Sequence, residues 1–329
     1  MLFMESFDAV SLADLAKKWT VANVSFVTGR SGQGISMGFF ETLYKDFAPI
    51  PVARAGVAYR VIGALGGYPI KFSSSVGLDP WVQLHVLDDG RLAVTSSGSA
   101  LSAGSLSVIT LGNWYFIELE AQYINGAGTT SMCVFTVRVN DRVVLSDVLT
   151  GLPTVGAGSD VWTRVALQGK GGGVNNELDD FYLNDYGLLG DGSVYVSHPN
   201  ADGGTLDWVP QHGGAHYVEI DETVPDGDAS TIESSNVGDV DLAYLAPVNP
   251  SMEIHGIQSC YFLKTDEGPG TEVQPTYDFG GVPYDSLNRF VPTADYEYGL
   301  EGYPTNPATA APFTPADIIT MQQGLRRTA

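Results

Sequence analysis

The chain has 329 residues, among them 39 Gly and 18 Pro, and only 16% of its residues are charged. This composition is typical of short strands joined by tight turns, and it argues against a mainly helical protein. The formal net charge is −22, and residues 171–263 contain 16 Asp and Glu but no Lys or Arg. Because such a surface repels phosphate groups, we expect no binding to nucleic acid or to anionic membranes.

The beginning of the chain lacks the features of a secretion signal. Glu5 and Asp8 precede any basic residue, and no apolar run followed by small residues is present. No apolar stretch of the sequence is long enough to cross a bilayer. Cys133 and Cys260 have no neighbouring metal ligands, which favours two buried, reduced thiols, with a disulfide as the alternative. We therefore expect synthesis and folding in a cytoplasm.

Strand patterns follow one another through the first half of the chain. A Gly-rich turn within residues 23–40 separates two strand-like pieces, as in a hairpin. Asp88-Asp89-Gly90 has the residues of a second tight hairpin turn. The segments that alternate apolar and polar residues or are rich in β-branched residues are 56–62, 68–72, 81–87, 91–95 and 106–111.

The clearest alternation lies in two consecutive segments. Residues 113–123 read NWYFIELEAQY, and residues 133–144 read CVFTVRVNDRVV. Alternate residues of each segment can share one face, and Asn140-Asp141 predicts a turn. We expect two long antiparallel strands of one sheet here, followed by two more strands at residues 161–168 and 177–183.

A Trp-led strand NWYFIELEAQY, an arm VRVNDRVV and a closing strand LDDFYLND occur here in this order. In order and spacing they resemble concanavalin-A-like or laminin-G-like jelly rolls. The resemblance implies an all-β protein with an antiparallel β-sandwich over residues 1–187. It predicts the fold and not the function, because this sandwich occurs in lectins, hydrolases, adhesion modules and structural domains.

The second half of the chain is acidic and rich in turns. We expect a β-rich connector over residues 188–248 and a small β-rich C-terminal domain over residues 249–329. A helix is predicted at about residues 315–324, with Thr314 as its N-cap and Pro315 at its first position. Ile318, Met321 and Leu325 follow at helical spacing.

The sandwich, the linker DDFYLNDYGLLGDGSVYVSHPNADG and the tail NPATAAPFTPADI together resemble a group of bacteriophage virion proteins. This resemblance implies a structural component of the particle, at the capsid surface, the head-tail junction or the tail. Such a protein acts through contacts with copies of itself and with other virion proteins, and it needs no active site. The alternatives are a lectin-like module that recognises a host surface glycan and, third, a glycoside hydrolase or lyase.

A glycoside hydrolase needs two carboxylates that flank the bond to be cleaved. Enzymes of this fold that cleave β-glucans carry Glu-x-Asp-x-Glu or a version with one more spacer. Glu177 and Asp179 fit the first two positions, but the third is Phe181 or Tyr182. We therefore predict no enzymatic activity, and we keep Asp179 and Asp180, expected beside an edge strand, as ligand or interface candidates.

Metal binding is the next alternative. His212 and His216, with Glu219 and Asp221 close behind, are candidate metal ligands, but their Gly-Gly loop favours exposed or hydrogen-bonding histidines. We expect no cofactor, with calcium in acidic turns as the alternative. The candidate calcium ligands are Asp185, Asp191, Asp221, Asp226 and Asp228.

Aromatic residues of the second half are candidates for contact with sugars or with another subunit, because their rings combine apolar faces with a polar group. These candidates are Trp208, Tyr284, Tyr296, Tyr298 and Tyr303. His85 is isolated in the sequence and is predicted to be a packing or surface residue.

Overall fold

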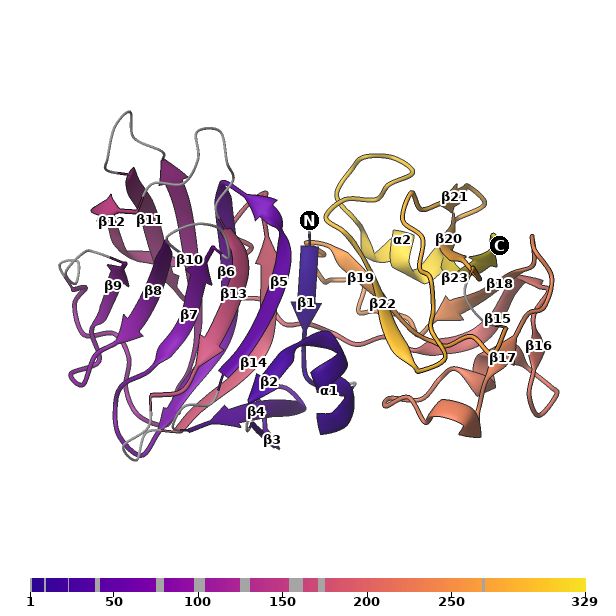
Figure 1. The fold of residues 1–329 in the computed structure, drawn as a ribbon, viewed down its shortest axis with the longest axis horizontal. Coiled ribbons are helices and arrows are strands. Elements are labelled where there is room, and N and C mark those ends of the chain that lie inside the picture. The colour runs from indigo at the N-terminus through magenta and orange to yellow at the C-terminus, as the bar shows by residue number, and fades with distance from the viewer. Residues whose placement is uncertain are drawn as a thin grey trace. The chain divides into compact units, whose positions relative to one another are not determined.

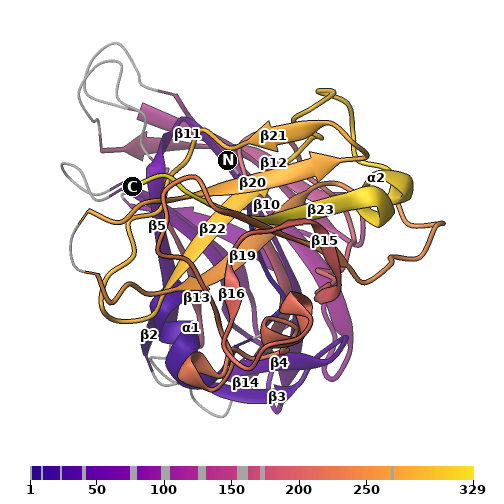
Figure 2. The ribbon, with the colours of Figure 1, turned by 90° about the vertical axis from the view of Figure 1, so that its right-hand side faces the viewer.

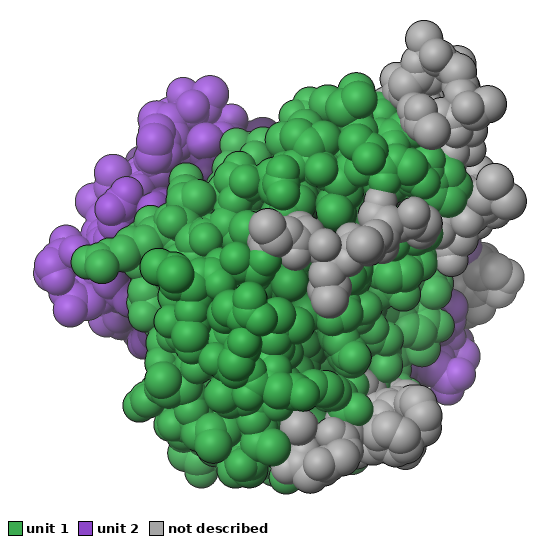
Figure 3. All heavy atoms as spheres, turned by 90° about the vertical axis from the view of Figure 1, so that its left-hand side faces the viewer, with its two compact units in different colours: residues 1, 3–194 green, residues 2, 195–329 purple. Residues whose placement is uncertain are grey.

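A computed structural model describes residues 2–8, 10–22, 24–38, 42–74, 80–97, 104–124, 131–153, 162–170, 175–267 and 270–329. The chain forms two compact units, Phe3–Val194 (unit 1) and Tyr195–Ala329 (unit 2) (Figure 3). The sequence had suggested three parts with a first boundary at residue 187.

Unit 1 is a sandwich of two antiparallel sheets (Figure 1). In the eight-stranded sheet the order is β12-β11-β10-β6-β14-β4-β3, with β1 paired to β14, and in the six-stranded sheet it is β2-β5-β13-β7-β8-β9. The first sheet comprises β1 (Leu2–Glu5), β3 (Ser25–Thr28), β4 (Gln33–Met37), β6 (Val52–Ile62), β10 (Trp114–Ile124), β11 (Ser131–Val139), β12 (Arg142–Leu152) and β14 (Asn175–Asn184). The second comprises β2 (Thr20–Ala22), β5 (Thr42–Ile50), β7 (Tyr68–Ser73), β8 (Trp81–Val86), β9 (Leu92–Ser96) and β13 (Trp162–Gln168).

The core of unit 1 follows from alternation along the strands. Ile117, Leu119 and Ala121 of β10 are fully buried, as the pattern in NWYFIELEAQY predicted. Trp162 of β13 is also fully buried, and its indole Nε1 donates a hydrogen bond to the carbonyl oxygen of Ala121 at 3.0 Å. This contact links the two sheets across the core.

The predicted hairpins of unit 1 are confirmed. β8 pairs with β9 around the turn at residues 88–90, and β11 pairs with β12 around Asn140 and Asp141, whose φ angles are 46° and 66°. β3 pairs with β4, although residues 23, 39 and 40 of that predicted hairpin lie outside the described part of the chain. Residues 106–111, predicted as a strand, form none.

A helix that the sequence analysis did not predict follows β1. It is α1 (Leu12–Lys18), and the side chain of Ser11 caps it by accepting a hydrogen bond from the backbone N–H of Asp14. Its last residue, Lys18, is 7% exposed and forms an ion pair with the buried carboxylate of Glu5 at 3.4 Å. The helix is therefore fixed to β1 by a buried ion pair.

Residues 185–194, which follow β14, are held along unit 1 by its side chains; we call this segment the strap. The backbone N–H of Gly190 donates to Glu118 Oε1 at 2.8 Å, and that of Leu189 donates to the Tyr182 hydroxyl at 3.0 Å. Leu189 also packs against the buried Phe116 and Tyr182 rings. The strap therefore belongs to unit 1, which is why this unit extends to Val194.

Unit 2 is built on a five-stranded sheet with the order β15-β18-β23-β20-β21 (Figure 2). Its strands are β15 (Pro199–Leu206), β18 (Val240–Leu245), β20 (Val273–Phe279), β21 (Pro283–Asp285) and β23 (Met321–Arg327). Its other elements are β16 (Val209–Pro210), β17 (Ile232–Glu233), β19 (Ile257–Leu263), β22 (Glu297–Tyr303), η1 (His216–Glu219), η2 (Gly227–Ala229) and α2 (Pro315–Thr320). The predicted connector and C-terminal domain are thus one unit, because β18 pairs with β23.

The predicted C-terminal helix is present, but it is shorter than predicted. α2 begins at Pro315 after a capping box formed by Thr314 and Asp317, and it ends at Thr320. Met321 and Leu325 belong instead to β23, which pairs with β18 and β20. The fold class is therefore confirmed: an antiparallel β-sandwich is followed by a smaller β-rich unit with a short C-terminal helix.

The two cysteines are free thiols, with Cys133 buried and Cys260 exposed, so the prediction of two buried thiols is wrong for Cys260. Among the described residues, no helix has the length and apolarity needed to span a membrane.

Candidate functional site

One face of the six-stranded sheet gathers polar and aromatic side chains. On β8, Val82, Leu84 and Val86 point into the core and are at most 2% exposed. Because side chains alternate along a strand, Trp81, Gln83 and His85 point to the opposite side, and all three are partly exposed. We call this outward surface of the six-stranded sheet the polar face.

The strand register arranges the side chains of the polar face in three rows, because residues opposite one another on neighbouring strands share a face. The first row consists of Asp46, Arg164, Ser73 and Trp81. The second row consists of Tyr44, Ala166, Lys71, Gln83 and Thr95. The third row consists of Thr42, Gln168 and Tyr68, together with His85 and Ala93.

Two cations lie over aromatic rings of the polar face. Lys71 Nζ is 5.1 Å from the centre of the Trp81 ring, and the guanidinium carbon of Arg164 is 4.0 Å from the centre of the Tyr44 ring. Arg164 also donates from Nε and Nη2 to the two carboxylate oxygens of Asp46, at 2.6 and 2.8 Å. These contacts fix both cations beside aromatic planes.

Hydrogen bonds connect the middle of the polar face. Gln83 Nε2 donates to Gln168 Oε1 at 2.6 Å, and His85 Nε2 lies 2.8 Å from Thr95 Oγ1. The Tyr68 and His85 rings meet edge to face, with their centroids 4.7 Å apart. The side chains are therefore held in defined orientations before any ligand arrives.

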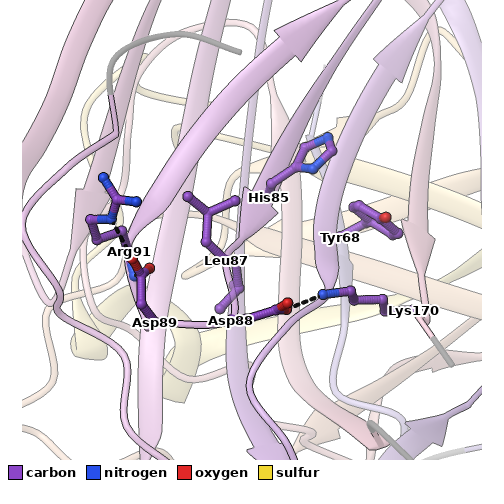
Figure 4. Close-up of a pocket in the computed structure, with 8 residues that line it drawn as sticks. Tyr68, His85, Leu87, Asp88, Asp89, Arg91 and Lys170 are labelled. Atoms are coloured by element: carbon purple, nitrogen blue, oxygen red, sulfur yellow. Dashed lines mark hydrogen bonds and ion pairs between the residues drawn. The ribbon is translucent and has the colours of Figure 1, made fainter. Parts of the chain in front are cut away.

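A pocket of about 440 Å³ opens beside His85 (Figure 4). This volume lies in the range of small-molecule sites. Lys170 forms an ion pair with Asp88 at the pocket, and Arg91 forms one with Asp89. The lining residues are Tyr68, His85, Val86, Leu87, Asp88, Asp89, Arg91 and Lys170.

Burial, together with the positive charge of Lys170, lowers the pKa of His85 to about 4. The imidazole is therefore neutral at physiological pH. A neutral imidazole has one donor and one acceptor nitrogen, and in His85 the Nε2 nitrogen is already in contact with Thr95 Oγ1.

Asp179 and Asp180 are buried, although they were predicted beside an edge strand as ligand or interface candidates. Both are at most 1% exposed, and β14 is an inner strand between β6 and β4. A bulge after Asp179 interrupts the pairing with β6, and Asp180 there has a φ of 49°. Neither carboxylate is therefore available to an external ligand.

The carboxylates of Asp179 and Asp180 bind backbone amides. Asp179 Oδ2 accepts hydrogen bonds from the N–H groups of Arg30 and Ser31 at 2.8 and 3.0 Å. Asp180 Oδ1 accepts one from Val194, at the end of the strap, at 2.8 Å. Burial raises the pKa of Asp179 to about 7, against the opposing effect of these donors. The pair fixes loop geometry and does not provide hydrolytic carboxylates.

The candidate ligands of the calcium alternative are not brought together. Among the described residues, no three His, Cys, Asp or Glu side chains are grouped so as to hold a metal ion. Asp191 instead pairs with Arg30, and Asp228 pairs with Lys264, both at 2.5 Å. The candidates for that alternative were Asp185, Asp191, Asp221, Asp226 and Asp228.

The two histidines considered as metal ligands have separate partners. His212 Nδ1 lies 2.9 Å from Glu219, and His216 Nδ1 lies 2.7 Å from the buried carboxylate of Asp241. Each therefore makes a local contact within unit 2, in agreement with the hydrogen-bonding alternative.

Of the aromatic candidates, Tyr303 is a buried core residue, and Tyr284 packs against the same core while it stays partly exposed. Tyr303 is 9% exposed and belongs to the core cluster of unit 2 with Tyr277. Tyr284 packs against the same cluster. Both rings therefore contribute apolar faces to the core of unit 2.

The other aromatic candidates are only partly buried. Tyr296 stacks on Phe262 with ring centroids 4.7 Å apart, and Tyr298 contacts the same ring at 4.8 Å. Trp208 donates from its indole Nε1 to the carbonyl oxygen of Asp239 at 3.4 Å. These residues lie in unit 2 and are not part of the polar face.

Comparison with known proteins gives no family assignment. No family model matches the chain, and no curated protein matches it. Solved structures with a similar fold include cellulose induced protein Cip1 (12% identity, TM-score 0.44, 58% of this chain and 100% of that chain). Another is alginate lyase Aly36B, with 12% identity and a TM-score of 0.39 over 57% of this chain and 98% of that chain. A third is carbohydrate-binding module CBM66 from Bacillus subtilis, with 11% identity and a TM-score of 0.34 over 51% of this chain and 96% of that chain. These similarities concern the fold alone.

The polar face was not identified from the sequence. The alternation in WVQLHVL predicted the strand, and the same alternation places Trp81, Gln83 and His85 on one side. This signal was present, but His85 was considered alone. Tyr44, Lys71 and Arg164 come from three other strands, and only the register brings them beside β8.

Proposed function

We propose that unit 1 binds a glycan on its polar face. The observation that carries this proposal is the presence of Trp81, Tyr68 and Tyr44 on one sheet surface, among amide, hydroxyl and imidazole groups. Aromatic rings provide apolar planes for the C–H faces of sugar rings, and the polar groups between them can bond to sugar hydroxyls. This was the second hypothesis from the sequence.

The dimensions of the polar face suit a short oligosaccharide. Trp81 and His85 are four positions apart on β8, which corresponds to about 13 Å along a strand. Ser73, Ala93 and Ala166 lie between the larger side chains and are at most 9% exposed. Their small side chains leave a low floor along which a sugar chain can lie.

The acidic residues on the polar face fit binding of a glycan better than its hydrolysis. Asp46 is the one acid in the three rows, as far as the described residues show, and it is engaged by Arg164. The two acids of the adjoining pocket, Asp88 and Asp89, are paired with Lys170 and Arg91. Glycoside hydrolysis needs two carboxylates on either side of the cleaved bond. We therefore propose recognition of a glycan without hydrolysis.

Trp81→Ala tests this proposal. Glycan-array screening of the full chain comes first, followed by calorimetry on the best oligosaccharide. We expect Trp81→Ala to weaken binding about tenfold or more, because it removes the stacking plane. Trp114→Ala is the matched control, since Trp114 lies beneath Arg60 in a similar pair at 4.6 Å, on the eight-stranded sheet. The proposal would be contradicted if both variants lost glycan affinity equally, or if the wild type bound no glycan.

The role in a bacteriophage particle stays a proposal from the sequence, and glycan binding is compatible with it. One observation favours homotypic contacts: β12 is an edge strand, and its Val143 and Val148 are 57% and 45% exposed. Light scattering of the purified protein is the first test. A defined oligomer supports this role, whereas a monomer that is absent from particles examined by electron microscopy argues against it.

A further inference from the structure

The polar face differs in charge from the rest of the chain. The whole sequence has 38 acidic and 16 basic residues. On the described part of the face and its pocket, the basic residues are Lys71, Arg91, Arg164 and Lys170, and the acidic residues are Asp46, Asp88 and Asp89. Acids outnumber bases by more than two to one overall, but not on this surface. The surface is therefore suited to an anionic ligand, although the chain as a whole is strongly acidic.

The acids of this surface are more exposed than the bases they contact. Asp88 is 82% exposed and its partner Lys170 is 31% exposed; Asp46 is 58% exposed and its partner Arg164 is 35% exposed. Ion pairs with such exposed acids add little stability, so the acid can leave without disturbing the fold. A carboxylate on a ligand can then take its place on the less exposed base.

The geometry of the bases also suits a carboxylate. The two guanidinium donors of Arg164 already hold both oxygens of the Asp46 carboxylate, and this forked contact is specific for planar anions. Lys71 lies over the Trp81 ring, so a sugar stacked on Trp81 would place its substituents beside the ammonium group.

We propose that the glycan bound by the polar face is one whose sugar units carry carboxylates. Trp81 supports a sugar ring, Lys71 and Arg164 bind its carboxylates, and Lys170 binds a further carboxylate at the pocket. This inference rests on the proposed function and adds the chemical class of the ligand.

The test compares each carboxylated glycan with its own carboxyl-reduced form, which keeps the sugar linkages and removes the charge. Suitable probes are oligomers of galacturonate, of mannuronate and guluronate, and of the hyaluronan repeat. We expect the full chain to bind at least one carboxylated probe about tenfold or more tightly than the reduced form. The difference should shrink as salt is raised, because salt screens charge.

Lys71→Gln and Arg164→Gln should each weaken binding of the carboxylated probe at least about fivefold, with little effect on the reduced form. Arg142→Gln, an exposed position on β12, is the matched control and should change neither. Tighter binding of a reduced form, or equal binding of both forms, overturns the inference and leaves the proposed function standing. If no carboxylated glycan and no neutral glycan binds, both the inference and the proposed function are overturned.

Discussion

His85 illustrates how single residues acquire their properties from the fold. In the sequence its immediate neighbours, Leu84 and Val86, are apolar and suggest no role. In the structure it contacts Tyr68, and it lines the same pocket as Lys170, which reaches this place from the end of another strand. The position of its side chain followed from alternation along β8, but its lowered pKa depends on residues that are distant in sequence.

The pKa of His85 predicts how stability depends on pH. The folded-state pKa of about 4 is below the unfolded value, so the unfolded state binds more protons between these two values. The contribution of His85 to the free energy of unfolding is therefore complete at neutral pH, and it is lost as the pH falls from about 6.5 to 4. When the pH falls through this range, we expect the free energy of unfolding of His85→Gln to decrease by up to about 3 kcal/mol less than that of the wild type.

Urea unfolding of unit 1 at several pH values between 4 and 7, followed by tryptophan fluorescence, measures this effect. His255→Gln changes an exposed histidine of unit 2 and is the control. If the free energy of unfolding falls equally steeply with decreasing pH in the wild type and in His85→Gln, the prediction is contradicted.

Gly29 is a second residue whose importance depends on a distant partner. A Cβ at this position would lie against the Asp179 carboxylate and 2.8 Å from the backbone nitrogen of Gly34. We expect Gly29→Ala to destabilise unit 1 by about 2–4 kcal/mol, because the buried carboxylate would lose its amide donors. Gly187→Ala, where a Cβ has no heavy atom within 4 Å, should have almost no effect. Thermal unfolding of both variants gives the comparison.

Among the secondary-structure elements, those of unit 1 with clear alternation were predicted correctly. The pattern of β10 and β11 and the turn residues at 88–90 and 140–141 are local signals that agree with the fold. β23 shows where local signals fail. Its residues continue a helical spacing, but Gly324 lets the carbonyl of Asp241 on β18 approach so closely that any side chain would overlap it. Pairing with two strands therefore ends the helix at Thr320.

Helix α1 was missed because its sequence offers only a short apolar pattern, and its stability comes from tertiary contacts. The Glu5–Lys18 pair is almost fully buried. We expect Lys18→Met to destabilise unit 1 by about 3–5 kcal/mol, because the carboxylate of Glu5 would be left buried without its cation.

The double variant Glu5→Gln with Lys18→Met should recover part of this loss, since neither charge then remains. Denaturant unfolding of the two single variants and the double variant forms a complete cycle. Additive losses would show that the pair is not coupled.

At the scale of the whole molecule, the strap determines where unit 1 ends. A fragment ending at residue 187 lacks Leu189, which covers Phe116 and Tyr182, and Gly190, whose amide binds Glu118. Glu118 is 1% exposed, so the loss of this donor leaves a buried carboxylate less well satisfied.

We therefore expect fragment 1–194 to be more stable than fragment 1–187 by about 2–4 kcal/mol. Denaturant unfolding of the two fragments measures the difference. Equal stabilities would mean that the strap contributes little to unit 1. The boundary could not be read from composition, because the strap has the Gly-rich, acidic character of a linker although it is bound like part of a domain.

The contact between Lys71 and Trp81 has a spectroscopic consequence. Trp19 and Trp162 are 2% and 0% exposed, so their emission should respond little to events at the surface of unit 1. The Trp81 indole is partly exposed beneath the Lys71 ammonium group, and a ligand that occupies this ring changes both its solvent contact and its nearest charge. The protein thus carries an intrinsic fluorophore in its polar face, which can report ligand occupancy without any label.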